Sequence, residues 1–352
     1  MATHRRPRQP RLARATLTAA AATAVALGAA AAAQASPADP AVASHPSEQE
    51  VKQQVDELYA QAETATERYD GTRERVRQLR VEAASLQDQV ARGRDALNRM
   101  LEDLSEIAGA QYRSGGIAPT MQLMLSSDPD GYLDRATALD RLAAQQADVL
   151  HEVATKQRAL DQRRAEAAAR LADLETARHD LVRDKQDVQR RLGRARALLD
   201  TLTGGQRARL TAEDARAARQ RVNAATGGVG LSSLPAPDAR AATAVAAATG
   251  ALGSPYFYGA AGPYSFDCSG LMYWAWRQAG VTLPRTSQAQ AGAGRRIPLS
   301  EARPGDLVIY YGDMHHVGMY VGGGTIIHAP YPGARVRYES ARTMPIAAVV
   351  RV

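Results

Sequence analysis

Apolar residues recur alternately every three and every four positions along the first half of the chain. The stripe begins at Val51 and ends at Ile107, and only Thr72 and Gly93 interrupt it. A heptad pattern kept over this length is typical of a coiled-coil helix, which would be ~85 Å long at 1.5 Å per residue. Its apolar members are Val51, Val55, Leu58, Ala62, Ala65, Tyr69, Val76, Leu79, Ala83, Leu86, Val90, Leu97, Met100, Leu104 and Ile107.

A second, less regular stripe runs from Tyr132 to Leu202, with Arg164, Arg178 and Lys185 at stripe positions. Charged residues there indicate partial exposure. The intervening segment 109–131 contains glycine and proline pairs that favour a reversal of the chain. We therefore predict an antiparallel coiled-coil domain over residues 47–222 with its tip at 109–131. The apolar cluster in this tip, Met121, Leu123, Met124 and Leu125, either closes the end of the hairpin or contacts a partner.

Residues 223–239 are rich in Gly, Ser and Pro and form a predicted linker. The pattern then changes to a compact domain over 240–352. We expect helices over 239–252 and 268–279, followed by short strands that alternate with turns. The expected strands are Leu307–Tyr311, His316–Val321, Thr325–Ala329, Arg335–Glu339 and Ala347–Val352. Helices followed by an antiparallel sheet predict an α+β fold for this domain.

Residues 1–35 have the pattern of an export signal. Five arginines precede an uncharged stretch from Ala15 to Ala33, and Ala33-Gln34-Ala35 is a small-x-small cleavage site. Removal of this segment lowers the formal charge from +7 to +2, because 44 basic residues become 39 against 37 acidic ones. The basic character therefore belongs mainly to the signal, and we expect no nucleic-acid partner. The predicted location is secreted or cell-wall-associated.

Cys268 is the only cysteine of the chain and stands at the start of a predicted helix. Unpaired N–H groups at a helix start favour a thiolate, so we expect the pKa of this thiol to be lowered. One thiol cannot form an internal disulfide, and an exported free thiol suggests catalysis or intermolecular pairing. No Cys or His pair has metal-ligand spacing except the adjacent His315 and His316. We therefore expect neither a metal nor a cofactor.

Two histidines are candidates for the base that a catalytic thiol needs. Successive strand residues point to opposite faces, so only one of His315 and His316 can face the thiol. His328, on the next expected strand, can hydrogen-bond that imidazole and hold its tautomer.

Several motifs together resemble the NlpC/P60 cysteine peptidases. They are Pro255-Tyr256-x-Tyr258-Gly259, Phe266-Asp267-Cys268-Ser269-Gly270-Leu271, Leu283-Pro284-Arg285-Thr286-Ser287, Arg303-Pro304-Gly305-Asp306-Leu307-Val308, His316-Val317-Gly318-Met319-Tyr320 and Ile327-His328-Ala329-Pro330. The resemblance covers roughly residues 240–352 and implies a papain-like fold with Cys268 as nucleophile, His316 as base and acid, and His328 as the residue that orients His316. It also implies that Tyr256 faces the developing oxyanion and that Asp267, Ser269, Arg285 and Ser287 lie near the substrate. Ala260-Ala261 departs from the further glycine that many members have.

The resemblance implies hydrolysis of peptidoglycan stem peptides, usually between D-γ-glutamyl and diaminopimelic acid. A coiled-coil hairpin joined to such a domain is also similar to secreted wall hydrolases, some of which are governed by the membrane complex FtsE–FtsX. Two alternatives remain: a coiled-coil adaptor whose C-terminal domain only binds wall peptide, and an amidase or acyltransferase that uses the same dyad. We also expect the second helix, through Arg164, Arg178 and Lys185, to dock over Cys268, until a membrane partner at the 121–125 cluster releases it.

Overall fold

The computed structural model describes residues 47–113, 121, 124–125, 130–227 and 238–352. The predicted export signal lies outside the described residues. So do most of the predicted tip and residues 228–237 of the predicted linker. Among the described helices, none combines the length and the apolar character that crossing a membrane would require.

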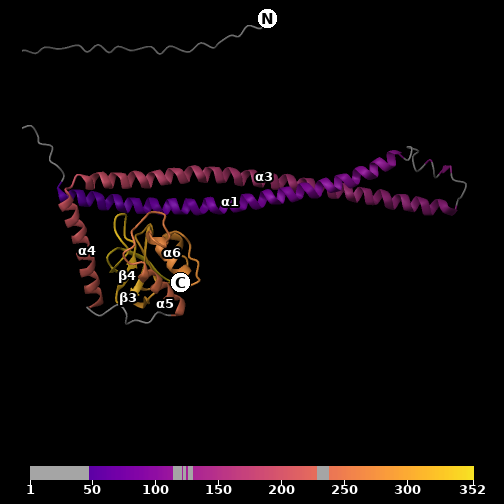
Figure 1. Ribbon diagram of the computed structural model, residues 1–352. Coiled ribbons are helices and arrows are strands. Elements are labelled where there is room, and N and C mark those ends of the chain that lie inside the picture. The colour runs from indigo at the N-terminus through magenta and orange to yellow at the C-terminus, as the bar shows by residue number, and fades with distance from the viewer. Residues whose placement is uncertain (1–46, 114–120, 122–123, 126–129, 228–237) are drawn as a thin grey trace, which may run out of the picture. The chain divides into compact units, whose positions relative to one another are not determined.

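Two long helices, α1 (Glu48–Arg113) and α3 (Asp130–Asp200), run side by side in opposite directions (Figure 1). The start of α1 has the hydrogen bonds of a capping box, because the Ser47 and Glu50 side chains each accept from the other residue's N–H. Two groups of apolar residues are buried where α1 packs against α3 and the residues that follow it. One contains Val51, Val55 and Leu202, and the other contains Val76, Leu79, Leu174 and Ala177.

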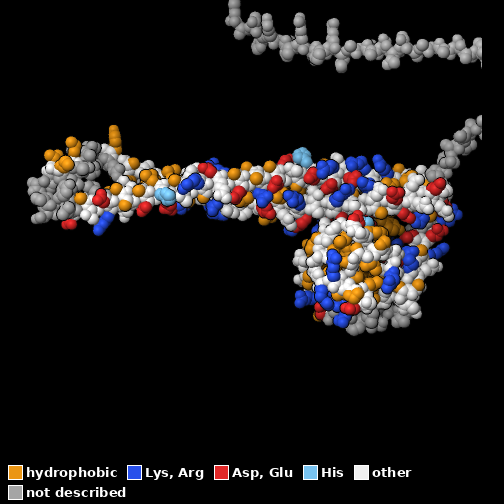
Figure 2. Space-filling view, turned by 180° about the vertical axis from the view of Figure 1, so that it is seen from behind, with side chains coloured by type: hydrophobic (Ala, Val, Ile, Leu, Met, Phe, Trp, Pro, Cys, Tyr) orange, Lys and Arg blue, Asp and Glu red, His pale blue; other side chains and the backbone are white. Residues whose placement is uncertain are grey.

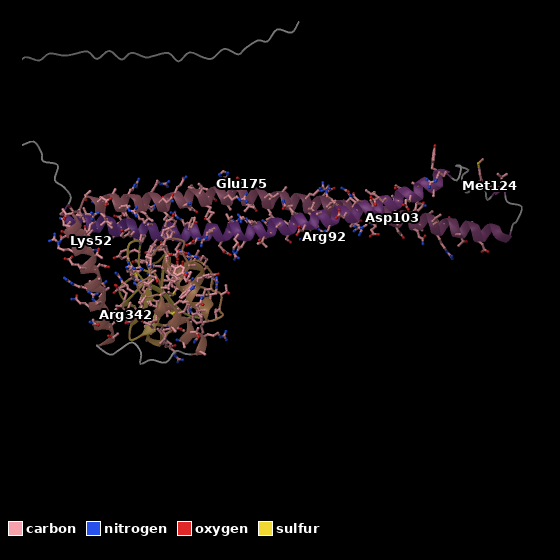
Figure 3. All side chains as sticks on the ribbon, viewed as in Figure 1. Lys52, Arg92, Asp103, Met124, Glu175 and Arg342 are labelled. Carbon is pink, nitrogen blue, oxygen red and sulfur yellow. The ribbon has the colours of Figure 1, made fainter. Side chains whose placement is uncertain are left out.

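Both long helices become more exposed toward Arg113 of α1 and Asp130 of α3. Ile107 and Leu150 are stripe residues, yet each is exposed. Met124 lies at this end of the hairpin and is also exposed (Figure 3). Basic, acidic and apolar side chains alternate along the visible face of the hairpin (Figure 2). The pairing of α1 with α3 therefore rests mainly on the apolar contacts in the half that includes residues 51–79.

A third helix, α4 (Gly204–Thr226), begins where α3 ends. Thr203 caps it through a capping box with Gln206. Arg221 of α4 donates two hydrogen bonds to Glu339, at 2.8 and 3.0 Å, and Tyr331 donates one of 2.7 Å to Asp214. These contacts attach α4 to the edge strand of the C-terminal sheet.

The C-terminal domain contains a six-stranded antiparallel sheet in the order β1-β6-β2-β3-β4-β5. The strands are β1 (Arg295–Ile297), β2 (Leu307–Tyr310), β3 (His316–Gly322), β4 (Thr325–His328), β5 (Arg337–Ser340) and β6 (Ile346–Arg351). The central strands β2, β3 and β4 are buried along their whole length. The sequence did not indicate β1, because three residues with two exposed arginines carry no strand pattern.

Four short helices accompany the sheet: α5 (Ala239–Gly250), α6 (Cys268–Gln278), α7 (Ser287–Gln290) and the 3-10 helix η2 (Leu299–Glu301). Leu271 and Met272 of α6 are buried in one core together with Ala244 of α5 and Val317 and Met319 of β3. Long helices followed by an antiparallel sheet confirm the predicted α+β fold class. α6 packs against β3. Cys268 at the start of α6 lies close to His316, the first residue of β3.

Candidate active site

The first turn of α6 is held by its capping residue. The Asp267 carboxylate accepts a 2.7 Å hydrogen bond from the Gly270 N–H, so Cys268 occupies the first helical position. A side chain at Gly270 would place its Cβ 2.1 Å from the Ala260 carbonyl oxygen, so only glycine permits this close approach. The thiol is buried, with 1 % of the Cys268 surface exposed.

His316 and His328 lie on neighbouring strands and contact each other. The Nε2 atom of His316 is 2.9 Å from Nδ1 of His328, and the two rings are nearly perpendicular. The side chain of His315 makes different contacts: it stacks on Tyr311, and its Nδ1 atom is 2.5 Å from an Asp313 carboxylate oxygen. The strand geometry thus couples His316, and not His315, to His328.

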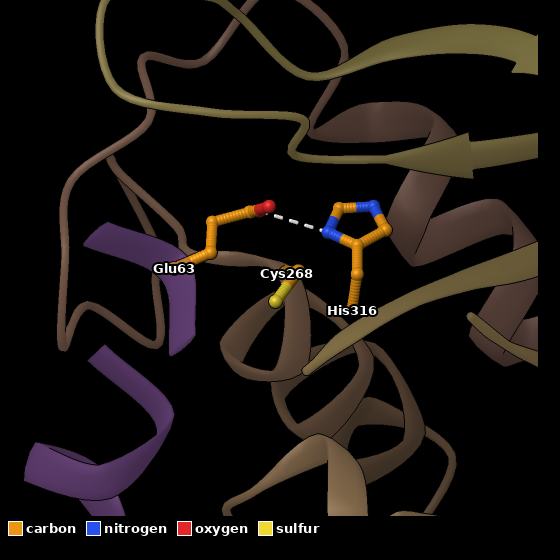
Figure 4. A group of neighbouring side chains, drawn as sticks. All are labelled: Glu63, Cys268 and His316. Atoms are coloured by element: carbon orange, nitrogen blue, oxygen red, sulfur yellow. Dashed lines mark hydrogen bonds and ion pairs between the residues drawn. The ribbon is translucent and has the colours of Figure 1, made fainter. Parts of the chain in front are cut away.

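Two carboxylates of α1 enter the site. Glu63 accepts a 2.8 Å hydrogen bond from Nδ1 of His316, and Figure 4 shows Cys268 beside this pair. Glu67 accepts hydrogen bonds of 2.6 Å from the Ser269 hydroxyl and 2.7 Å from the Ser287 N–H, and it lies 3.5 Å from the Cys268 sulfur. The spacing of four residues places both carboxylates on one face of α1.

Arg285 joins α1 to the start of α6. Its guanidinium donates a 2.6 Å hydrogen bond to Asp267, another of 2.9 Å to the Ser269 hydroxyl, and forms a 3.1 Å ion pair with Asp70 of α1. Arg73 of α1 adds a 3.0 Å hydrogen bond to the Gly259 carbonyl. All the residues expected near the substrate, Asp267, Ser269, Arg285 and Ser287, therefore converge here, and each is in contact with α1 or with a residue that α1 contacts.

Residues 253–350 match the profile of the NlpC/P60 family. The C-terminal domain is an NlpC/P60 domain. A probable endopeptidase of Corynebacterium glutamicum is 44 % identical over 127 residues, which are 34 % of this chain and 60 % of that protein. A gamma-D-glutamyl-L-lysine dipeptidyl-peptidase of Bacillus subtilis is 41 % identical over 90 residues, which are 24 % of this chain and 30 % of that protein.

The chain therefore spans about 60 % of the length of the first curated relatives that it matches. A solved structure, the NlpC/p60 domain of the peptidoglycan hydrolase SagA, is 34 % identical and covers 32 % of this chain and 98 % of its own, with a TM-score of 0.31. The family profile covers residues 253–350 and does not extend to the hairpin.

The charges around the NlpC/P60 thiol differ from the prediction made for an isolated helix start. Burial, followed by the carboxylates of Glu67 and Glu63, raises the pKa of Cys268 well above its usual range. The expectation of a lowered pKa is wrong for this form of the protein, because α1 excludes water and brings negative charge to the thiol. The same burial, with the Asp267 carboxylate, raises the pKa of Glu67 to about 7.

Tyr256 and His328 each keep one buried polar atom without a hydrogen-bond partner among the described residues: the tyrosine hydroxyl and Nε2 of the histidine. Burial, and then the charges of Glu63 and Cys268, raises the pKa of Tyr256, so its hydroxyl stays protonated as a donor. Burial, and then the neighbouring His316, lowers the pKa of His328, which is therefore neutral at physiological pH. The Nδ1 atom of a neutral His328 can donate to Nε2 of His316 while the His316 proton lies on Nδ1 against Glu63, and it accepts from Nε2 when Nδ1 of His316 is free to act as the base.

The helix that covers the thiol is α1 and not α3, which the charged stripe residues had predicted. Arg178 and Lys185 of α3 are exposed, and the residues that reach Cys268 are acidic residues of α1. No signal in the sequence marked Glu63 and Glu67 for this contact, because exposed faces of long helices commonly carry acidic residues at such spacings. Their partners are two hundred and more residues away along the chain.

Proposed function

We propose that this protein is an exported cysteine endopeptidase that cuts peptidoglycan stem peptides at the bond between D-γ-glutamyl and diaminopimelic acid. The observation that carries the proposal is the position of the only thiol, at the first turn of α6 and beside the His316–His328 pair of an NlpC/P60 domain. The names of the relatives, which include an endopeptidase and a gamma-D-glutamyl-L-lysine dipeptidyl-peptidase, support this substrate class.

In this proposal Cys268 attacks the carbonyl carbon of the scissile amide. His316 takes the thiol proton and later gives it to the leaving amine, while His328 holds the imidazole of His316 in place. The Cys268 N–H and the Tyr256 hydroxyl donate to the oxyanion that forms. Water then hydrolyses the thioester, with His316 again acting as the base. Asp267, Ser269, Arg285 and Ser287 supply the polar donors and acceptors that position the stem peptide.

In this proposal the contacts of α1 with the NlpC/P60 domain define a closed form of the protein. Glu63 occupies the His316 nitrogen that the thiol proton would need, and Glu67 occupies the donors of Ser269 and Ser287. We infer that α1 must leave the NlpC/P60 domain before a stem peptide can bind. A membrane partner of the FtsE–FtsX type, bound at the hairpin end that contains Met124, would favour the open form by binding it more tightly.

A variant that cannot close is needed to test hydrolysis. Glu67 is 3 % exposed and is surrounded by Cys268, Ser269 and Ser287, so Glu67→Trp has too large a side chain for this space. Glu57 is exposed on the same helix, and Glu57→Trp is the matched control. Glu67→Trp should open the site while Glu57→Trp should leave it closed.

The first test compares Glu67→Trp with the double variant Glu67→Trp/Cys268→Ala on purified peptidoglycan, with mass spectrometry of the released fragments. We expect D-γ-glutamyl–diaminopimelate cleavage by the open variant. The double variant should lose at least a thousandfold in rate, because no nucleophile remains. Circular dichroism of both variants controls for folding. Equal cleavage by the two proteins would refute the assignment of Cys268, and cleavage at a different bond would refute the substrate assignment.

A further inference from the structure

We propose that the closed protein binds a zinc-type divalent cation between the hairpin and the NlpC/P60 domain, with Glu63, Cys268 and His316 as ligands. One donor atom from each residue lies within 4.8 Å of the other two, and all three residues are buried (Figure 4). The ligands come from three elements, α1, α6 and β3. The site therefore exists only while α1 covers the thiol.

The donor set has the chemistry that zinc prefers. Thiolate sulfur, imidazole nitrogen and carboxylate oxygen are its usual protein ligands, at bond lengths of about 2.0–2.3 Å. Tetrahedral bonds of this length place donor atoms roughly 3.3–3.7 Å apart. The Glu63 oxygen and Nδ1 of His316, which are 2.8 Å apart, must therefore separate slightly, while the remaining donor pairs lie within 4.8 Å and approach by at most about 1.5 Å. Three protein ligands leave one tetrahedral position for water.

The surroundings of the three ligands also favour a cation. Glu67 places a second carboxylate oxygen 3.5 Å from the Cys268 sulfur, and the carboxylate of Asp267 caps the same helix turn. The buried guanidinium of Arg285 is already paired with Asp267 and Asp70. Among the described residues, the carboxyl groups that α1 brings closest to the thiol, those of Glu63 and Glu67, form no ion pair with an arginine. A divalent cation bound at this point offsets their charge.

The residue next to the imidazole ligand fits the same arrangement. A metal-bound histidine normally uses its second ring nitrogen to donate a hydrogen bond, which fixes the ring. Here Nε2 of His316 is 2.9 Å from Nδ1 of His328. With the metal on Nδ1, the proton of His316 lies on Nε2 and is donated to His328. The step transfers no electrons: the metal replaces the thiol proton, which passes to solvent, while the single proton of His316 moves from Nδ1 to Nε2 and the proton of His328 lies on its own Nε2, so that Nδ1 of His328 accepts.

A bound cation would stabilise the closed form of the protein. This inference rests on the proposed function as a peptidase that α1 closes. A cation that binds Cys268 and His316 together with Glu63 of α1 connects the two parts of the molecule through the same groups that catalysis needs. Removing the metal should therefore both free the dyad and weaken the hold of α1.

The test measures zinc binding directly on the full chain. Affinity and stoichiometry come from competition with a chromogenic chelator, and Co²⁺ replaces Zn²⁺ to give a thiolate-to-metal absorption band. We expect one tight site in the wild type and in the control Glu57→Gln. Zinc should bind at least tenfold more weakly to Glu63→Gln, which keeps the shape but loses the anionic ligand, and to Glu67→Trp, which separates α1 from the thiol. Cys268→Ala should lose the cobalt band.

Equal zinc affinity in the wild type and Glu63→Gln, or a wild type without the cobalt band, would overturn the proposal. Weak binding that persists in Cys268→Ala would identify a surface site, such as the exposed pair His179 and Glu175. The readout is separate from hydrolysis. If the wild type binds zinc as expected but Glu67→Trp does not cleave peptidoglycan, the proposed function alone is refuted. If Glu67→Trp cleaves peptidoglycan but the wild type binds no zinc, the metal site alone is refuted.

Discussion

At the scale of single residues, the two adjacent histidines show how backbone position sets chemical role. His316 begins β3 and meets His328 on β4, whereas the side chain of His315 stacks on Tyr311 and pairs with Asp313. Only the carbonyl oxygen of His315 reaches the thiol, at 3.8 Å. An imidazole that is paired with a second, neutral histidine is the better placed of the two to exchange a proton with Cys268.

The residue-scale prediction compares His316→Ala with His315→Ala, both in the open background Glu67→Trp. Loss of a general base typically lowers the rate by about 10²–10⁴-fold, so we expect such a decrease in kcat for His316→Ala. His315→Ala loses the stacking on Tyr311 and the contact with Asp313, and it should keep its rate within about tenfold. Steady-state cleavage of a synthetic stem peptide measures both. An inactive His315→Ala beside an active His316→Ala would reverse the assignment.

At the scale of elements, α1 has two different faces. One packs its apolar stripe on α3, and the other presents Glu63, Glu67 and Asp70 to the NlpC/P60 domain. The steps of four and three residues give these acidic side chains the periodicity of one helix face. The apolar stripe continues on the side of α1 that faces α3, so these acidic residues do not interrupt the heptad pattern.

The element-scale prediction concerns the accessibility of the thiol. Removing Glu67 together with Glu63, as Glu63→Ala/Glu67→Ala, leaves the Ser287 N–H and the His316 ring unpaired if the site stays closed. Each unpaired buried donor costs about 1–3 kcal/mol, and each 1.4 kcal/mol is a factor of ten. A thiol reagent should therefore label Cys268 at least tenfold faster than in the wild type. The chain has one cysteine, so the label reports this site alone.

Glu57→Ala, an exposed position on the same helix, is the control for a general loosening of α1. It should label at the wild-type rate. Identical rates for the wild type and the double variant would show that these carboxylates do not hold the closed form.

At the scale of the whole molecule, closure places charged groups of both parts in one buried cluster. Burial, and then the Asp267 charge, raises the pKa of Asp70 to about 8, although Arg285 and Arg73 oppose the shift and Glu67 adds to it. A carboxyl with a raised pKa stabilises the closed form fully below its open-form pKa of about 4, and this contribution is lost as the pH rises through about 8. Rising pH should therefore open the molecule.

The corresponding measurement is the rate of Cys268 labelling between about pH 5 and 8.5, expressed as the ratio of the wild type to Glu67→Trp. Dividing by the labelling rate of the open variant removes the intrinsic pH dependence of the thiol reaction. We expect the ratio to increase with pH, and to increase less in an Asp70→Asn background, because an amide binds no proton in this range. A ratio that decreases with pH would contradict the predicted sign.

The sequence by itself determined the parts of the protein that depend on local pattern. Heptad spacing predicted two long helices, and α1 and α3 lie where it placed them. The expected helices and strands after residue 239 predicted the α+β fold, because capping and strand alternation act over a few residues. The resemblance of the motifs around Cys268, His316 and His328 implied the NlpC/P60 domain. Only the tertiary structure decided which helix covers the thiol. Glu63 and Glu67 are ordinary acidic residues in the sequence, and they acquire their role when folding brings them to Cys268 and His316. The raised pKa of the thiol and the candidate metal site follow from that contact, because burial and the field of neighbouring charges depend on distance in space and not on spacing along the chain.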